Sequence, residues 1–135
     1  LRTMVHEYYQ DMPCIILLEG ITYFLTKREI EKIVTSFSSR GNKNILMIEY
    51  LKPLREVNAK MRYIPERIFE KIKAHSGIKQ ISSFPPSFIE KTITKRGGKL
   101  ETKKNLSDLE TNQQGNNKHF DQPDNGWIEY EVWNI

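Results

Sequence analysis

Two short apolar runs mark the first half of the chain, at residues 14–18 and 45–48. Neither run alternates with polar residues, which predicts strands buried on both faces of a parallel sheet. Between them, Ile30, Ile33, Val34 and Phe37 recur at helical spacing and form one apolar stripe. Thr26 and Glu29 have the spacing of a capping box that opens this helix. The pattern predicts a β-α-β unit with parallel strands.

The second half of the chain has weaker signals. After a connection at residues 53–63, Pro65 is expected to open a helix that Gly77 ends. Ser87 and Glu90 predict a second capping box. The helix that it opens should stop at Gly97 and Gly98.

The chain is then expected to end in two strands joined by a long loop. Residues 99–106 are a plausible, more polar strand, and residues 111–126 are predicted to be a mobile loop rich in Asn, Gln, Asp and Gly. Residues 127–133 alternate: Ile128, Tyr130 and Val132 face one way, and Glu129, Glu131 and the two tryptophans face the other. The last two strands should form an antiparallel hairpin.

This order of elements predicts an α/β fold in which residues 1–135 are part of a doubly wound domain. We expect the first strand to be central in such a sheet, which leaves its open edge without a cover. Pairing of that edge with a second copy or another subunit is an open possibility.

Composition narrows the class of protein. Lys and Arg number 21 against 17 Asp and Glu, a modest excess that fits solubility better than nucleic-acid binding. The densest basic stretch, residues 91–104, has Glu90 just before it and Glu101 within it, and it contains no aromatic residue for base stacking. No apolar run approaches the roughly 20 residues of a membrane span. The chain has a single cysteine, Cys14, which lies in an apolar run and is predicted to be a small buried side chain. One cysteine cannot form an internal disulfide, which fits a reducing cytoplasm.

One stretch of sequence resembles a known family. Residues 13–26 read PCIILLEGITYFLT: a proline, an apolar strand, Glu-Gly, an aromatic pair with Leu, and a threonine that opens a helix. This resembles the leucine carboxyl methyltransferase family, which includes related bacterial O-methyltransferases. Phe24 between Tyr23 and Leu25 departs slightly from the family spacing. Residues 87–100 resemble the late helix and strand of these enzymes, and Leu1-Arg2 resembles the end of an Asp-Leu-Arg element.

The resemblance implies a fold and a cofactor. It implies the C-terminal half of a Rossmann-like class I sheet, with residues 14–18 as its fourth strand and residues 45–50 as its fifth. The implied cofactor is S-adenosyl-L-methionine, bound in part by Glu19, Gly20 and Leu1. The family's glycine-rich loop has no counterpart, since no G-x-G occurs in the sequence. We therefore expect this piece alone to be inactive.

Elementary physics indicates the same edge of the sheet. Ligands of open α/β sheets bind beyond the carboxyl ends of the strands, where Glu19, Gly20, Glu49 and Tyr50 are expected. A carboxylate there can accept hydrogen bonds from the cofactor and offset the positive charge of its sulfonium. The alternative for Glu19 is a solvated strand end or a partner of the next helix. For Glu49 and Tyr50 a structural role is favoured, and Tyr23 fits the cleft or the core equally.

Three hypotheses follow from the sequence. The first is an O-methyltransferase that acts on a carboxyl or hydroxyl group of a small-molecule substrate. The second is a non-catalytic, methyltransferase-like interaction module that pairs through its open sheet edge. The third and weakest is a nucleic-acid binder that uses residues 91–104. No catalytic triad is expected, because methyl transfer mainly needs alignment of the reacting groups, and the scattered histidines offer no metal-ligand spacing.

Overall fold

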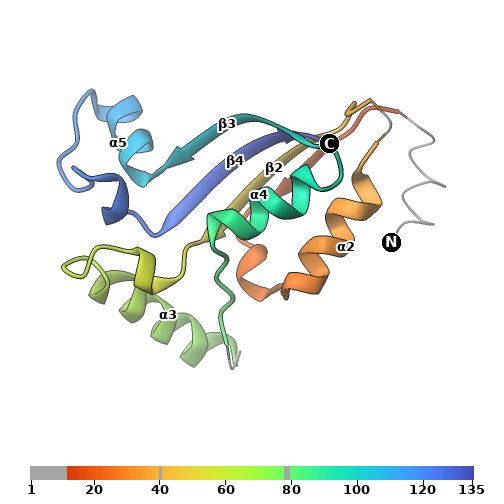
Figure 1. Ribbon diagram of the computed structural model, residues 1–135. Coiled ribbons are helices and arrows are strands. Elements are labelled where there is room, and N and C mark those ends of the chain that lie inside the picture. The colour runs from red at the N-terminus through yellow and green to blue at the C-terminus, as the bar shows by residue number, and fades with distance from the viewer. Residues whose placement is uncertain (1–11, 40, 78–79) are drawn as a thin grey trace.

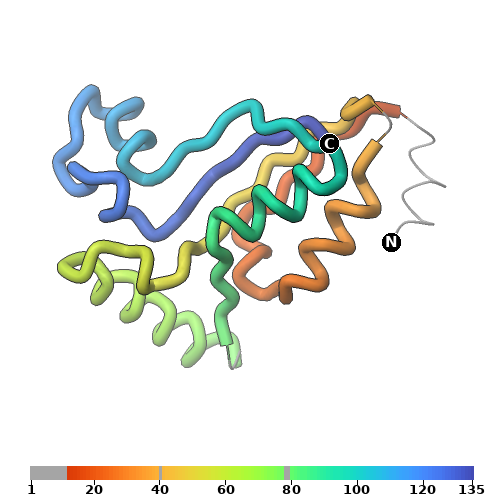
Figure 2. The backbone as a smooth tube through the Cα atoms, in the orientation of Figure 1, coloured from red at the N-terminus to blue at the C-terminus, as the bar shows by residue number. Residues whose placement is uncertain are grey.

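The protein is an α/β structure built on one four-stranded mixed sheet. The computed structural model describes residues 12–39, 41–77 and 80–135. The strands are β1 (Ile15–Leu18), β2 (Ile45–Leu51), β3 (Lys99–Asn105) and β4 (Ile128–Asn134), in the spatial order β1-β2-β4-β3. β1 and β2 are parallel, and β4 is antiparallel to both of its neighbours. Figure 2 shows the four segments running side by side. The predicted parallel pair and closing antiparallel hairpin are both confirmed.

Four described helices accompany the sheet: α2 (Lys27–Phe37), α3 (Tyr63–Ser76), α4 (Pro86–Thr94) and α5 (Leu106–Gln114). Short 3-10 turns lie at η1 (Thr22–Phe24), η2 (Leu54–Glu56) and η3 (Pro123–Asn125). In Figure 1, α2 and α4 lie together over one face of the sheet, whereas α3 and α5 lie beyond the end at which β2 stops. Among the described residues, no helix is both long and apolar enough to cross a membrane.

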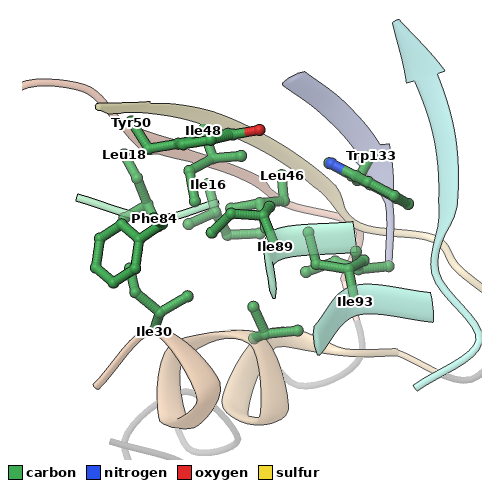
Figure 3. Packing of buried hydrophobic residues seen from close by; sticks show 12 residues of the cluster. Ile16, Leu18, Ile30, Leu46, Ile48, Tyr50, Phe84, Ile89, Ile93 and Trp133 are labelled. Atoms are coloured by element: carbon green, nitrogen blue, oxygen red, sulfur yellow. The ribbon is translucent and has the colours of Figure 1, made fainter. Parts of the chain in front are cut away.

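The hydrophobic core lies between the sheet and helices α2 and α4, as Figure 3 shows. Strand residues Ile16, Leu18, Leu46 and Ile48 face the helices, and Trp133 closes the cluster from β4. The helices contribute four fully buried residues, which are Ile30, Val34, Ile89 and Ile93. Gly98 allows the chain to pass close under α4, because a Cβ there would meet Ile93 Cγ2 at 2.3 Å. The core therefore depends on one side of β1, β2 and β4.

The prediction that β1 and β2 are each buried on both faces is wrong. On β2, Met47 is 37% exposed. Ile15 is 66% exposed and Leu17 is 61% exposed, while their neighbours Ile16 and Leu18 are buried. The cause is the placement of the helices, since α2 and α4 cover the same face and no other described element covers the opposite one. We call that uncovered side the open face. By register it carries Ile15, Leu17, Ile45, Met47, Glu49, Tyr130 and Val132.

The helix boundaries agree with the sequence where a strong capping signal exists. Thr26 and Glu29 form both hydrogen bonds of the predicted capping box, and Gly77 ends α3 in the left-handed conformation at φ 70°. The capping box predicted at Ser87 is wrong: α4 begins at Pro86, and its N-cap, Pro85, makes no side-chain hydrogen bond. Proline at the first helical position needs no cap for its missing N–H.

The segment predicted as a loop from residue 111 is partly helical. Asn105 ends β3 and caps α5 through a reciprocal hydrogen-bond pair with Asp108. The helix runs on to Gln114 before the chain turns. The carboxylate of Glu110 then accepts the backbone N–H groups of His119 and Phe120 at 2.8–3.0 Å. These bonds give the connection to β4 a defined path.

Candidate functional site

Two glutamates meet at the carboxyl ends of β1 and β2. The parallel register aligns Leu17 with Met47 and Leu18 with Ile48, so Glu19 follows β1 beside Glu49 of β2. Gly20 then turns the chain with φ at 67°, a left-handed conformation that glycine adopts without strain. The Gly20 backbone N–H favours the ionised form of the nearby Glu49 carboxylate and so acts to lower its pKa. The structure thus brings together Glu19, Gly20 and Glu49, all three of which the sequence places at this edge.

The turn after Gly20 is fixed against β2. The Thr22 hydroxyl, fully buried at the start of η1, donates to the Glu49 carbonyl oxygen at 2.7 Å. Tyr23 follows in the same turn, partly buried, with its ring edge-on to Phe24 at 6.3 Å between centroids. Its carbonyl oxygen accepts the Ser82 N–H at 2.8 Å. Tyr23 therefore lies in the turn that follows the glutamates, at the same end of the sheet.

The electrostatics couple these groups to a third side chain, Tyr130 of β4. Partial burial raises the pKa of Glu49, the nearby Glu19 carboxylate raises it further, and the Gly20 N–H opposes the shift. Burial likewise raises the pKa of Tyr130, with further contributions from Glu49 and then Glu19. Tyr130 is the register partner of Glu49 on the open face. Glu19, Glu49 and Tyr130 form what we call the open-face cluster.

The open-face cluster has acceptor capacity that the chain itself does not use. Among residues 12–39, 41–77 and 80–135, neither Glu19 nor Glu49 takes part in an ion pair. Glu19 is exposed, and Glu49 and Tyr130 are partly so. Two neighbouring carboxylates raise each other's energy when both are ionised. A ligand that brings positive charge or hydroxyl and amino donors relieves that repulsion, so the chemistry of the cluster suits such a ligand.

Two other residues predicted for the site, Tyr50 and Leu1, are not part of the open-face cluster. Tyr50 is fully buried on the face covered by the helices, where its hydroxyl donates to Glu131 Oε1 at 2.6 Å. It cannot face the same ligand as Glu49, its neighbour in the strand, because adjacent strand residues point to opposite faces. Leu1 lies outside the described residues.

The covered face holds a second group of charges that the sequence interpretation missed. Glu131 accepts from Tyr50, from Trp133 Nε1 at 2.8 Å, and pairs with Lys103 Nζ at 3.0 Å. Glu129 pairs with Lys52 Nζ at 3.4 Å and lies 3.9 Å from Lys103 Nζ. Burial raises the pKa of Glu129, and the two lysines oppose that shift. We call these residues the covered cluster.

The sequence analysis did not predict a site role for Tyr130 or for the covered cluster, although the sequence carries a signal for each. The alternation over residues 127–133 already assigns Glu129 and Glu131 to the face of Trp133, and Tyr130 to the other face. Two glutamates on the face that carries a tryptophan predict buried charges that need partners. What the alternation lacks is the register of β4 against β2, which alone aligns Tyr130 with Glu49.

The fold and the site define the class of this protein as an α/β protein with two glutamates at the carboxyl ends of a parallel strand pair. Comparisons with protein-family models, with curated proteins and with solved structures give no match. Function must therefore be argued from the open-face cluster itself.

Proposed function

We propose that this chain forms the carboxylate side of the cofactor site in an S-adenosyl-L-methionine-dependent O-methyltransferase, which methylates a carboxyl or hydroxyl group. The observation that carries the proposal is the meeting of Glu19, Gly20 and Glu49 at the carboxyl ends of two parallel strands. That edge is where open α/β sheets bind ligands. The parallel pair followed by an antiparallel hairpin also agrees with the Rossmann-like half-sheet that the resemblance implies.

The donor set fits the chemistry of this cofactor. Hydroxyl and amino groups of an adenosyl moiety donate to carboxylates, and the positive sulfonium is stabilised near uncompensated negative charge. Glu19 and Glu49 supply both properties, since neither has an ion-pair partner in the described part of the chain. In this proposal the residues bind and orient the cofactor. Alignment of the methyl group with its acceptor is the main requirement of the reaction.

The experiment is isothermal titration of the protein with S-adenosylhomocysteine and with S-adenosylmethionine. We expect Glu19→Ala to weaken binding by more than tenfold, about 1.4 kcal/mol. The loss should be larger for S-adenosylmethionine, because only that ligand carries the sulfonium charge. Glu31→Ala is the matched control, since Glu31 is an exposed glutamate of α2 away from the sheet edge, and it should leave both affinities unchanged.

Two results contradict the proposal. One is the absence of heat at millimolar ligand with protein whose circular dichroism shows it to be folded. The other is binding that Glu19→Ala and Glu31→Ala affect equally, because that result separates the ligand from the carboxylate edge.

A further inference from the structure

The two edges of the sheet are built differently. The outer strand β3 has the sequence KLETKKN, with three lysines and a register irregularity between Leu100 and Thr102. Lysines and bulges at an edge discourage pairing with another strand. The opposite edge strand, β1, has the sequence IILL, without charge, proline or irregularity. β1 therefore lacks the features that keep β3 a solvent-facing edge.

The backbone of β1 has hydrogen-bonding groups to offer. The carbonyl of Cys14 accepts from the Ile45 N–H at 2.9 Å, so Cys14 directs its carbonyl toward β2. In a parallel pair, alternate residues direct their backbone groups to the same side. Ile16 and Leu18 therefore also face β2, whereas Ile15 and Leu17 direct their N–H and C=O groups to the free edge. No described strand pairs with that edge.

A two-fold axis through Ile16 makes this edge complementary to itself. In an antiparallel pair centred there, Ile15 of one copy lies opposite Leu17 of the other, and Leu17 lies opposite Ile15. These are the residues with outward-directed backbone groups, so both positions can form hydrogen-bonded pairs. Opposed residues share a face, so the open faces of the two copies become continuous.

Charge favours the same arrangement. In this register Glu19 of one copy lies opposite Pro13 of the other, and Pro13 is aligned with Lys43, two residues before β2 in the same chain. Lys43 is exposed. Two strand spacings, about 10 Å, separate the backbones at Glu19 and Lys43, a span that the two long side chains bridge. The arrangement gives the cluster of Glu19 and Glu49 a cation from the second copy, and the two-fold axis repeats the contact.

We propose that two copies of this chain pair antiparallel through β1, so that their four-stranded sheets form one continuous sheet and Lys43 of each copy faces Glu19 of the other. The proposal goes beyond methyl transfer and does not depend on it, because it rests on the free edge of β1 and on the charges of Glu19 and Lys43. In the dimer, Lys43 of the second copy and a bound cofactor would compete for the Glu19 carboxylate. Since only three residues of β1, Ile15 to Leu17, pair with β1 of the other copy, the interface is small. We therefore expect a dissociation constant of about micromolar or weaker.

Sedimentation velocity over micromolar to hundreds of micromolar protein tests the proposal. Wild-type protein should shift from monomer to dimer as its concentration rises. Leu17→Lys should abolish the dimer without unfolding the protein, because Leu17 is already 61% exposed. The control is Leu100→Lys on the opposite edge strand, where Leu100 is 47% exposed, and it should dimerise as wild type does.

A charge exchange tests the register. Lys43→Glu and Glu19→Lys should each weaken the dimer at least tenfold, because each variant places like charges together at both contacts. A mixture of the two variants should restore dimers, since both contacts in a mixed pair then join opposite charges. Three results overturn the proposal: wild-type protein monomeric throughout, a dimer that survives Leu17→Lys, or single variants that the mixture does not rescue.

Discussion

The sheet holds two pairs of glutamates, one on each face, and their surroundings differ. Glu129 and Glu131 of β4 lie on the covered face, at most 5% exposed, and both pair with lysines of the same chain. Glu19 and Glu49 lie on the open face, at the carboxyl ends of β1 and β2. Neither pairs with a described lysine or arginine. The first pair is saturated by its own chain, whereas the second retains acceptor capacity.

The difference separates a structural role from a binding role. Buried carboxylates that keep their charge need cations and hydrogen bonds around them. Lys52, at the end of β2, and Lys103, on β3, supply the cations from both sides of β4. The covered cluster therefore ties β4 to both of its neighbours. Carboxylates without such partners suit a ligand or a second chain, which is the role we propose for the open-face cluster.

Among the substitutions that test this difference, Glu131→Ala should cause the largest loss of stability. The change leaves the Tyr50 hydroxyl and Trp133 Nε1 buried without their acceptor. We expect a loss of about 3 kcal/mol in the free energy of unfolding, the lower part of the range for broken buried pairs, because the half-exposed Lys103 can turn to solvent. Urea denaturation measures it.

The matching change on the other face is Glu19→Ala, which should alter stability by less than about 0.5 kcal/mol because the side chain is exposed. Equal losses for the two variants would remove the distinction between a structural pair and a binding pair. Glu131→Gln, which keeps an acceptor oxygen, should lose less than Glu131→Ala.

A smaller effect should follow from Tyr50→Phe. The substitution keeps the buried ring and removes one hydrogen bond to a charged carboxylate, at 2.6 Å in the native protein. Bonds of this kind contribute about 1.5–3 kcal/mol, and urea denaturation should show a loss in that range. The ring partner on the open face provides the control: Tyr130→Phe has no buried hydrogen bond of this kind to lose in the described structure. A loss for Tyr130→Phe as large as that for Tyr50→Phe would contradict the assignment of faces.

Local signals predicted the elements well. The capping box of Thr26 and Glu29 needs residues only three apart, and the helix stop at Gly77 needs one residue with a positive φ. The strands at residues 14–18 and 45–48 were likewise found from short apolar runs, and with them the strand ends where Glu19 and Glu49 lie. These parts of the candidate site follow from positions close together in the sequence.

Long-range features could not be predicted in the same way. A continuous apolar run is compatible with burial on one face or on both, and the outcome for Ile15 and Leu17 depends on where α2 and α4 pack. The partnership of Tyr130 with Glu49 depends on the register between strands some 80 residues apart. The cations of the covered cluster come from β3 and from the end of β2, and no local pattern connects Lys52 with Glu129.

The smallest change in stability is expected for Glu49→Gln, and this change should depend on pH. The pKa of Glu49 is raised above its usual value by burial and by Glu19, so folding favours the protonated form and ionisation disfavours the folded state. The contribution of Glu49 is therefore most favourable below the ordinary pKa near 4.5 and is lost as pH rises through the folded pKa. Gln keeps an acceptor for the Gly20 N–H without the charge. We expect Glu49→Gln to match wild type at pH 4 and to be more stable at pH 7, by about 0.2–1 kcal/mol for relief of a cross-strand like-charge pair. Urea denaturation at both pH values measures the difference. A stabilisation that is the same at pH 4 and pH 7 would show that the carboxylate repulsion is not its source.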